Sequence, residues 1–291
     1  MGLETILAGK RLKMTDSESR RMSLKKYTLA EFFCGCGGTS RGFTRSGRFD
    51  VVLGNDVKPE ALKTFEFNHR ADDIPPATIR QDIRLLKAST IQEALHERGV
   101  GKGDLDCMIG GPPCQGFSQL RRNEHREHGK IIKFSGYSQL AHDPRNDLVL
   151  RYLEIAEALR PKFLVIENVP QMLKHGFDGR LGRLSELVIQ MLEHDLGYKV
   201  EVAVVNCADY GVPQLRERAV FIASAIGAPS FPAPTHTDPA KSESLRNGRL
   251  PWVTVADAIG DLPAPSIDKD SLGGCSLDRY GPDPSDYAKS M

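Results

Sequence analysis

Residues 28–38 read TLAEFFCGCGG, a short, mostly apolar run that ends in a glycine-rich turn. This pattern predicts a strand over residues 28–33, a turn over residues 35–38 and a helix that continues to about residue 46. Glycines at such a strand-to-helix turn let the backbone bend tightly and approach a ligand closely. A glycine-rich turn alone is weak evidence of a binding site.

Strands and helices alternate along the chain on the carboxyl side of this turn. The strands are expected at residues 50–54, just before Asp82, and at 105–110, 163–166, 199–205 and 219–223; the helices are expected at 61–69, 90–98, 146–159 and 181–192. Repeated βαβ units predict an α/β fold with a doubly wound, mostly parallel sheet.

Composition divides the chain into three parts. Residues 1–26 are a polar tail, residues 27–225 contain the alternating elements, and residues 226–291 are rich in Pro and Gly with one short helical pattern at 253–259. We expect a tail, a cofactor-binding and catalytic domain, and an appendage without a core of its own.

The overall composition excludes some classes of protein. The 291 residues are 40% hydrophobic with a net charge of +1, and no run of eighteen apolar residues or signal-peptide core is present. We therefore expect a cytoplasmic protein without a membrane anchor. Six scattered cysteines lack metal-finger spacing, so we expect reduced thiols and no metal site.

Two carboxylates follow predicted strands. Asp56 comes after the second strand, where a carboxylate can accept the hydroxyl groups of a ribose, and Asp82 follows the third, where it can hold an adenine amino group. Either residue taken alone is as well explained as a helix cap. Their shared place at the carboxyl ends of neighbouring strands favours a nucleoside site.

A cysteine stands in a proline-framed turn after the fourth strand. Residues 110–118 read GGPPCQGFS and present Cys114 in a polar loop. A lone cysteine is usually a small buried apolar residue. The two prolines and the lack of apolar periodicity favour an exposed nucleophile that needs thiolate character.

Charged residues follow the last two strands that we expect at this edge. Glu167 ends the fifth strand, where it is either an acid/base partner of Cys114 or a helix cap. Arg216 and Arg218, two residues apart, are expected on one face of a strand, either as an anion or carbonyl clamp or as a solvated edge. Residues 121–133 contain five Lys or Arg, which indicates either a loop that closes on DNA phosphates or a solvated charged loop.

Four motifs together resemble those of the DNA cytosine-5 methyltransferases. They are FCGCGG at 33–38, PPCQ at 112–115, ENV at 167–169 and QxRxR at 214–218. The likeness covers residues 28–225 and continues more weakly over 231–265. It implies the Rossmann-like fold of S-adenosylmethionine-dependent methyltransferases, S-adenosyl-L-methionine as cofactor and double-stranded DNA as substrate.

The resemblance also implies roles for single residues. Glu31 stands where the family usually has Asp. The resemblance implies the following cofactor contacts: Phe33 packed on the cofactor, Gly35, Gly37 and Gly38 around its methionine part, Asp56 on the ribose, Asp82 and Ile83 at the adenine, and Pro112 and Leu148 lining the pocket.

The implied reaction is covalent. Cys114 adds to C6 of a flipped-out cytosine while Glu167 holds or protonates N3, and C5 then attacks the sulfonium methyl group. Loss of the C5 proton expels the cysteine. Arg216 and Arg218 stabilise the base carbonyl and the local geometry.

The family normally continues into a recognition domain and a closing Gly-Asn-x-Val segment, which residues 226–291 do not supply. We expect either a companion subunit that carries both or a truncated product, in a bacterial or phage setting, either with or without a cognate restriction endonuclease. Three alternatives stay open: a tRNA cytosine-5 methyltransferase, a non-catalytic cofactor- or DNA-binding subunit, and a nicotinamide-dependent oxidoreductase, which leaves the cysteine and Glu-Asn-Val motifs unexplained.

Overall fold

A computed structural model gives the fold of the chain. It describes residues 4–7, 10–13, 26–72, 74–113, 125–127, 130–132, 147–174, 183–241 and 247–261. Cys114, the side chains of the charged loop at 121–133 and residues 262–291 lie outside the described part, so the predictions for them stay predictions.

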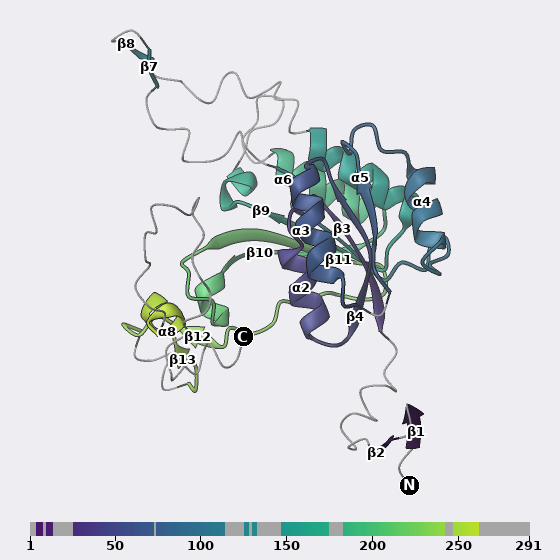
Figure 1. Ribbon diagram of the computed structural model, residues 1–291. Helices are drawn as coiled ribbons and strands as arrows, with labels where there is room; N and C mark the ends of the chain where they lie inside the picture. The colour runs from purple at the N-terminus through teal and green to yellow at the C-terminus, as the bar shows by residue number, and fades with distance from the viewer. Residues whose placement is uncertain are drawn as a thin grey trace. The chain divides into compact units, whose positions relative to one another are not determined.

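A seven-stranded sheet forms the centre of the fold (Figure 1). Its order is β10-β11-β9-β6-β3-β4-β5. The strands are β3 (Tyr27–Phe32), β4 (Phe49–Asp56), β5 (Ala77–Arg80), β6 (Cys107–Gly110), β9 (Phe163–Asn168), β10 (Lys199–Asn206) and β11 (Glu217–Ser224).

Parallel pairing dominates this sheet. β3 runs parallel to both β4 and β6, β4 runs parallel to β5, and β6 runs parallel to β9. β11 is antiparallel to β9, with Ala219 opposite Asn168. The chain winds from β3 out to β5 and then returns to the other side of β3, so the winding reverses between β3 and β6. In open α/β sheets, ligands bind at the carboxyl ends of the strands at such a reversal.

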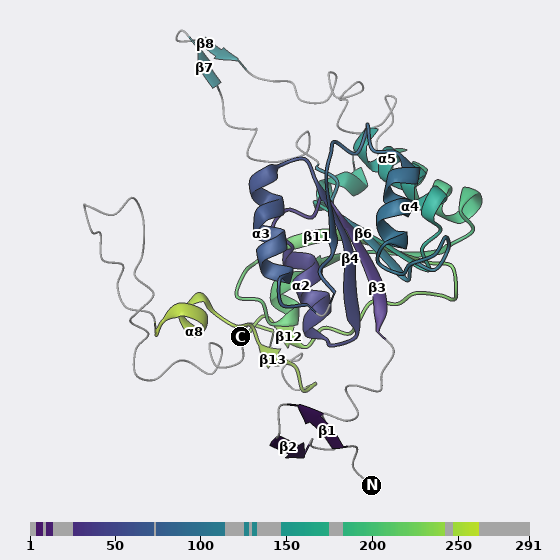
Figure 2. The same cartoon turned by 45° about the vertical axis from the view of Figure 1, so that its right-hand side comes forward.

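Helices cover both faces of the sheet (Figure 2). The helices are α2 (Gly38–Arg45) and α3 (Pro59–His69) on one face, and α4 (Ala88–His96), α5 (Asp147–Leu159) and α6 (Arg183–Gln190) on the other. A π-helical turn, η4 (Met191–Asp195), continues α6. None of the helices that the structure describes is long and apolar enough to cross a bilayer.

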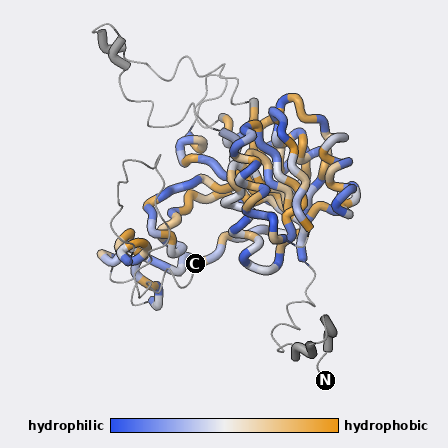
Figure 3. Tube along the Cα trace, viewed as in Figure 1, coloured by the Kyte–Doolittle hydropathy of each residue, from blue (hydrophilic) through white to orange (hydrophobic). Residues whose placement is uncertain are grey.

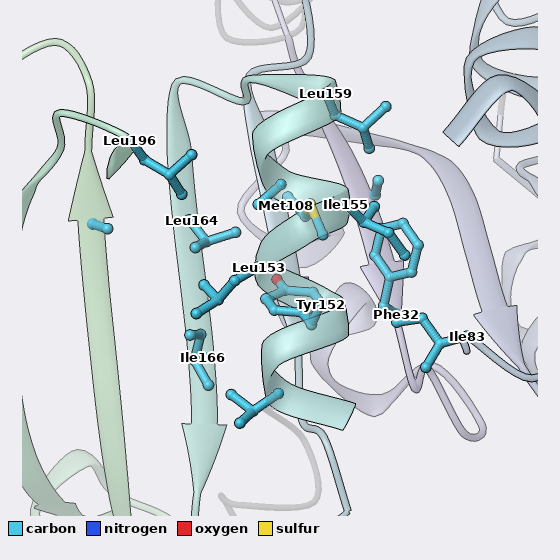
Figure 4. Close-up of a cluster of buried hydrophobic side chains, with 14 of the residues drawn as sticks. Phe32, Ile83, Met108, Tyr152, Leu153, Ile155, Leu159, Leu164, Ile166 and Leu196 are labelled. Carbon is cyan, nitrogen blue, oxygen red and sulfur yellow. The ribbon is translucent and has the colours of Figure 1, made fainter. Parts of the chain in front are cut away.

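Alternating residues of the strands supply two apolar cores, one on each face. On β3, Ala30 and Phe32 join the cluster under α4, α5 and α6, whereas Leu29 joins the cluster under α3. The hydropathy trace shows the same concentration of apolar residues in the sheet (Figure 3). Figure 4 shows α5 between Leu164 and Ile166 of β9 on one side and Phe32 of β3 on the other. Both faces of the sheet are thus buried, and the parallel pairing of its strands places their carboxyl ends at one edge.

The chain divides into two compact units, each described by itself. The first contains residues 1–203 and 219–230, and the second contains residues 204–218 and 231–291. In the second unit, Asp209 accepts hydrogen bonds from the Trp252 indole (2.8 Å) through its side chain and from the Thr235 amide (3.0 Å) through its carbonyl. The second unit also contains η5 (Cys207–Tyr210), β12 (His236–Thr237), β13 (Leu250–Pro251) and α8 (Val255–Ile259).

The predicted fold class is confirmed: the protein is α/β with a doubly wound, mostly parallel sheet. Several elements were not expected from the sequence. They are the strand pair β1 (Glu4–Leu7) and β2 (Lys10–Lys13) in the polar tail and the pair β7 (His125–Glu127) and β8 (Lys130–Ile132) in the charged loop. The short helix η3 (Pro170–Lys174) is the helix that the cap interpretation of Glu167 assumes. The division into tail, domain and appendage stays a prediction.

Candidate active site

The glycine-rich turn and the start of the Pro-Pro-Cys segment follow adjacent strands at the winding reversal. β3 and β6 pair in register, with Phe32 opposite Gly110. Phe33 therefore leaves the sheet beside Gly111. The sequence motifs at these two positions share one edge of the sheet, as predicted from their place at strand ends.

Backbone conformation in the glycine-rich turn is unusual. Phe33 has φ 54°, Gly35 has φ 53° and Gly37 has φ 81°, all in the left-handed region that favours glycine. Phe33 is half-buried, with its ring centroid 6.4 Å from that of Tyr152. A Cβ placed on Gly35 or Gly38 meets no atom within 4 Å. The turn thus presents an open backbone surface, as a ligand cradle requires.

Asp56 lies at the end of β4 and is bonded to this turn. Its Oδ2 accepts the Gly35 amide at 2.9 Å, and its Oδ1 accepts the Lys58 amide at 2.9 Å. A carboxylate oxygen has two acceptor positions, so each oxygen keeps one for a ligand hydroxyl. The predicted ribose contact is compatible with this geometry and stays a prediction.

Asp82 and Ile83 lie in the turn after β5. The Arg84 guanidinium donates to both Asp82 oxygens, at 3.0 and 3.2 Å from Nε. These bonds, with the bond from the Arg84 amide, lower the pKa of Asp82 by more than partial burial raises it. Ile83 is buried, and its carbonyl accepts a bond from Arg151 of α5. Asp82 is therefore an ionised acceptor held next to a buried apolar side chain, a suitable pair for an adenine. Leu148, predicted to line the same pocket, is also buried, on α5.

Glu167 lies beside the turn that leads to Cys114. A Cβ built on Gly111 would stand 3.1 Å from Glu167 Oε2, so the carboxylate lies directly against Gly111. The neighbouring Asn168 donates its side-chain amide to the Pro112 carbonyl at 3.2 Å. Both contacts follow from the parallel pairing of β6 with β9, in which Gly110 stands opposite Ile166. The structure thus brings Glu167 to the segment that enters the predicted nucleophile turn.

Comparison with a family model gives the decisive match. Residues 27–273 match the model of the C-5 cytosine-specific DNA methylases. The chain belongs to this family. The resemblance found in the sequence is thereby confirmed, and the family uses S-adenosylmethionine.

Relatives of this chain come from bacteria and animals. It is 34% identical to the type II methyltransferase M1.HphI of Haemophilus parahaemolyticus, over 84% of this chain and 55% of that one. It is 29% identical to DNA (cytosine-5)-methyltransferase 1 of Mus musculus, over 83% of this chain and 15% of that one. The chain therefore spans about half of the first relative and a small part of the second.

A third relative is similar in length. The type II methyltransferase M.AquIA of Picosynechococcus is 32% identical, over 81% of this chain and 88% of that one. Among solved structures, a DNA modification methyltransferase encoded within a prophage of E. coli aligns with a TM-score of 0.56 at 25% identity, covering 86% of this chain and 62% of that one. The sheet described above is thus the fold of known methyltransferases.

The two arginines of the QxRxR motif belong to the second unit. Arg216 precedes β11, which begins at Glu217, so the prediction that both arginines lie within a strand is wrong for Arg216. The Asn206 side chain accepts the Arg216 amide at 3.1 Å, and the Arg216 carbonyl accepts the Cys207 amide at 2.9 Å. These bonds hold Arg216 in the turn before the strand. A part for Arg216 and Arg218 in one site with Glu167 stays a prediction.

Two of the described thiols are poor nucleophiles. Burial, with the nearby charges of Glu31 and Asp56, raises the pKa of Cys34 far above its ordinary value. Burial, with the charge of Asp106, raises the pKa of Cys107 to about 12. Both thiols are therefore protonated at neutral pH. Cys36 is exposed and Cys207 is partly buried, whereas Cys114 lies outside the described residues.

Sequence reasoning missed several residues that shape this site. Asn168 lies inside a quoted motif, and Arg84 lies two residues after Asp82, so both were within reach of local inspection. Arg151 gives no sequence signal, because its bonds to the carbonyls of Ile83 (3.3 Å) and Leu86 (2.7 Å) depend on how α5 packs.

Proposed function

We propose that this methylase transfers a methyl group from S-adenosyl-L-methionine to C5 of cytosine in double-stranded DNA, through a covalent bond between Cys114 and C6. The observation that carries the proposal is the Glu167 carboxylate lying against Gly111, three residues before Cys114. Family membership supports the reaction class, and DNA is the substrate that the names of the relatives indicate.

The residues at the sheet edge fit the cofactor. The open surface of Gly35 and Gly38 suits the methionine part, and the free acceptor positions of Asp56 suit the ribose hydroxyls. The ionised Asp82 and the buried Ile83 suit the adenine, with Phe33, Pro112 and Leu148 as apolar neighbours. When bound, the cofactor supplies an electrophilic methyl group.

The remaining chemistry belongs to the chain's own residues. The Cys114 thiolate forms a bond to C6 of the base, and Glu167 holds or delivers a proton at N3, so that the electron pair released from the ring reaches C5. After C5 has gained the methyl group, loss of the C5 proton restores the ring double bond and breaks the bond from C6 to sulfur. Cys114 leaves as a thiolate, ready for another cycle.

Arg216 and Arg218 have a supporting part in the proposal. A guanidinium is a strong donor toward the O2 carbonyl of a cytosine, where negative charge grows during attack at C6. Arg216 is exposed and its backbone is held by the Asn206 side chain. Both arginines are therefore suitable as base contacts once DNA is bound.

The target cytosine must be flipped out of the DNA duplex for this reaction. C6 of a stacked cytosine is covered by its neighbours, so the target base must leave the helix before Cys114 reaches it. The five Lys and Arg residues of the loop at 121–133 are the phosphate contacts that we propose for this step.

Target choice is a further part of the proposal. The M1.HphI relative extends well beyond the aligned region, because the match covers only 55% of that relative's length. We expect the recognised sequence to depend on a recognition domain, carried either elsewhere in the protein or on a companion subunit. The type II relatives support a restriction-modification setting with a cognate endonuclease.

Methyl transfer from labelled cofactor tests the proposal. We expect label at C5 of cytosine in mixed-sequence duplex DNA, and none with the Cys114→Ser variant. Label on tRNA without label on DNA would favour an RNA methyltransferase of the same fold. Cofactor binding without transfer to either nucleic acid, with the companion subunit present, would favour a non-catalytic subunit.

A further inference from the structure

A chain of hydrogen bonds, fully buried at Ser40 and His69, adjoins the glycine-rich turn. Ser40 Oγ is 2.8 Å from His69 Nε2 and 3.1 Å from the Gly37 carbonyl oxygen. His69 Nδ1 is 2.6 Å from Asp72 Oδ2, and Arg41 bonds the other oxygen of that carboxylate at 3.3 Å. The side chains of α2 and of the end of α3 are thus connected directly to the turn.

A second bond joins the end of α3 to the same turn. The Asn68 side-chain amide donates to the Cys36 carbonyl at 2.7 Å. Gly37 also rests on this helix, because a Cβ there would stand 2.8 Å from the Phe65 ring and 3.2 Å from His69 Nε2. Two successive carbonyls of the turn are therefore held by two successive residues of α3, one directly and one through Ser40.

The order Ser, His, Asp resembles a hydrolase triad, but its surroundings exclude that use. Ser40 and His69 are both 0% exposed, so no substrate reaches the hydroxyl group. The hydroxyl oxygen also lies within bonding distance of the Gly37 carbonyl. A nucleophile must be accessible to the group that it attacks. The contacts indicate a structural task at the turn.

We propose that Asn68, His69, Ser40 and Asp72 form a turn clamp, a set of positioning residues that holds the glycine-rich turn in its cofactor-binding shape. This inference rests on the proposed function, since it assigns the clamp to the methionine part of S-adenosyl-L-methionine. Gly35 and Gly37 both have positive φ, a conformation that a free glycine segment leaves readily. Holding the Cys36 and Gly37 carbonyls removes that freedom before binding, so the ligand does not have to order the turn itself.

Asn68 offers the most direct test. Asn68→Ala removes the bond to Cys36 and leaves the buried core intact. We expect it to weaken S-adenosyl-L-methionine binding to the full chain by about threefold to tenfold in calorimetry, the value of one modest hydrogen bond. Lys63→Ala is the matched control, because Lys63 is exposed on the same helix and away from the turn. The control should leave affinity unchanged.

A pair of His69 variants separates positioning from simple stability. The Gln amide reaches the position of Nε2 and can bond Ser40, whereas the Asn amide reaches the position of Nδ1 and can bond only Asp72. We expect His69→Gln to keep affinity within about threefold and His69→Asn to lose about tenfold. A merely structural role would lower the stability of both variants, measured by urea unfolding, without separating their affinities.

The outcomes distinguish the clamp from the function on which it rests. If the unaltered chain binds no S-adenosyl-L-methionine, the proposed function fails and the clamp's role fails with it. If the unaltered chain binds the cofactor and Asn68→Ala and His69→Asn bind it equally well, the clamp alone is overturned. Weaker binding in these two folded variants, with the Gln variant and the Lys63 control near the unaltered value, supports the clamp.

Discussion

Glu31 places a carboxyl group in the core at the start of α2. The residue is 4% exposed, and its Oε2 accepts the Ser40 amide at 3.2 Å. Burial raises the pKa of this carboxyl above its ordinary value, while the bonds from Ser40 and Thr39 oppose the rise. Burial favours the neutral form of this carboxyl, whereas its position at a helix N-terminus favours the charged form.

This balance predicts a dependence of stability on pH. Because the folded pKa is raised, the folded chain holds the proton more tightly than the unfolded chain does. The resulting stabilisation is complete below the ordinary carboxyl value of 4.5 and is lost as pH rises through the folded pKa. Glu31→Gln cannot titrate, so its free energy of unfolding relative to the unaltered chain should rise between about pH 4 and pH 8 in urea titrations. A difference that stays constant over this range would contradict the expected shift.

Gly110 and Gly111 form a natural matched pair. A Cβ on Gly110 would stand 2.6 Å from the Tyr152 ring, whereas a Cβ on Gly111 would stand 3.1 Å from Glu167 Oε2. Gly110→Ala should lower the free energy of unfolding by about 1–3 kcal/mol, because a buried ring must shift. Gly111→Ala should leave stability nearly unchanged, because only the end of a side chain moves.

The Gly111→Ala variant tests the role of Glu167 in catalysis. Displacing the Glu167 carboxylate should lower kcat by about tenfold to a hundredfold, since small misplacements of catalytic groups are costly. Urea unfolding and methyl transfer measured on both variants check the pair. Full kcat in a well-folded Gly111→Ala variant would remove the reason for placing Glu167 in the reaction.

At the scale of elements, α5 holds the turn that carries the predicted adenine contacts. Arg151 donates to the carbonyls of Ile83 (3.3 Å) and Leu86 (2.7 Å), which fixes the turn after β5 against this helix. Leu148 lies one helical turn earlier on α5 and is buried. The helix α5 therefore contributes Leu148 to the predicted pocket and also holds the turn that carries Asp82 and Ile83.

Removing this guanidinium should weaken cofactor binding. Arg151→Met keeps the apolar stem and loses both carbonyl bonds together with the ion pair to Glu154, and we expect the dissociation constant for S-adenosyl-L-methionine to rise by about fivefold to tenfold. Glu157→Gln, at an exposed position of α5, is the control. Calorimetry that finds the two variants alike would show that the turn keeps its shape without Arg151.

Helices and strands of the sheet were largely predictable because their signals are local. Apolar alternation and glycine turns located the strand at Tyr27–Phe32 and the helix at Pro59–His69 to within two residues. The place of Arg216 before β11 was not predictable, because it depends on the Asn206 side chain bonding the Arg216 amide across a loop. The clamp was missed for the same reason, since Asn68 and His69 reach the turn only through the packing of α3.

At the scale of the whole molecule, the winding reversal of the sheet organises the site. It places the turn after β3 next to the segment after β6, while the parallel β6–β9 pair brings Glu167 to Gly111. Sequence motifs predicted this meeting because parallel strands end at a common edge. They did not predict the division into two units, because residues 204–218 join the second unit only through contacts distant in sequence.

Covalent trapping tests most directly whether Cys114 forms a bond to cytosine. The chain is incubated with S-adenosyl-L-methionine and mixed-sequence duplex DNA that contains 5-fluorocytosine. In this base, fluorine replaces the C5 hydrogen, so C5 has no proton to lose and the bond from C6 to sulfur persists. Denaturing gels detect the adduct and peptide mass spectrometry locates it, with Cys36→Ser as a control at an exposed thiol. We expect an adduct at Cys114 in the unaltered chain and in the control, and none in Cys114→Ser. An adduct that persists in Cys114→Ser, or that maps to another residue, would contradict a covalent role for Cys114.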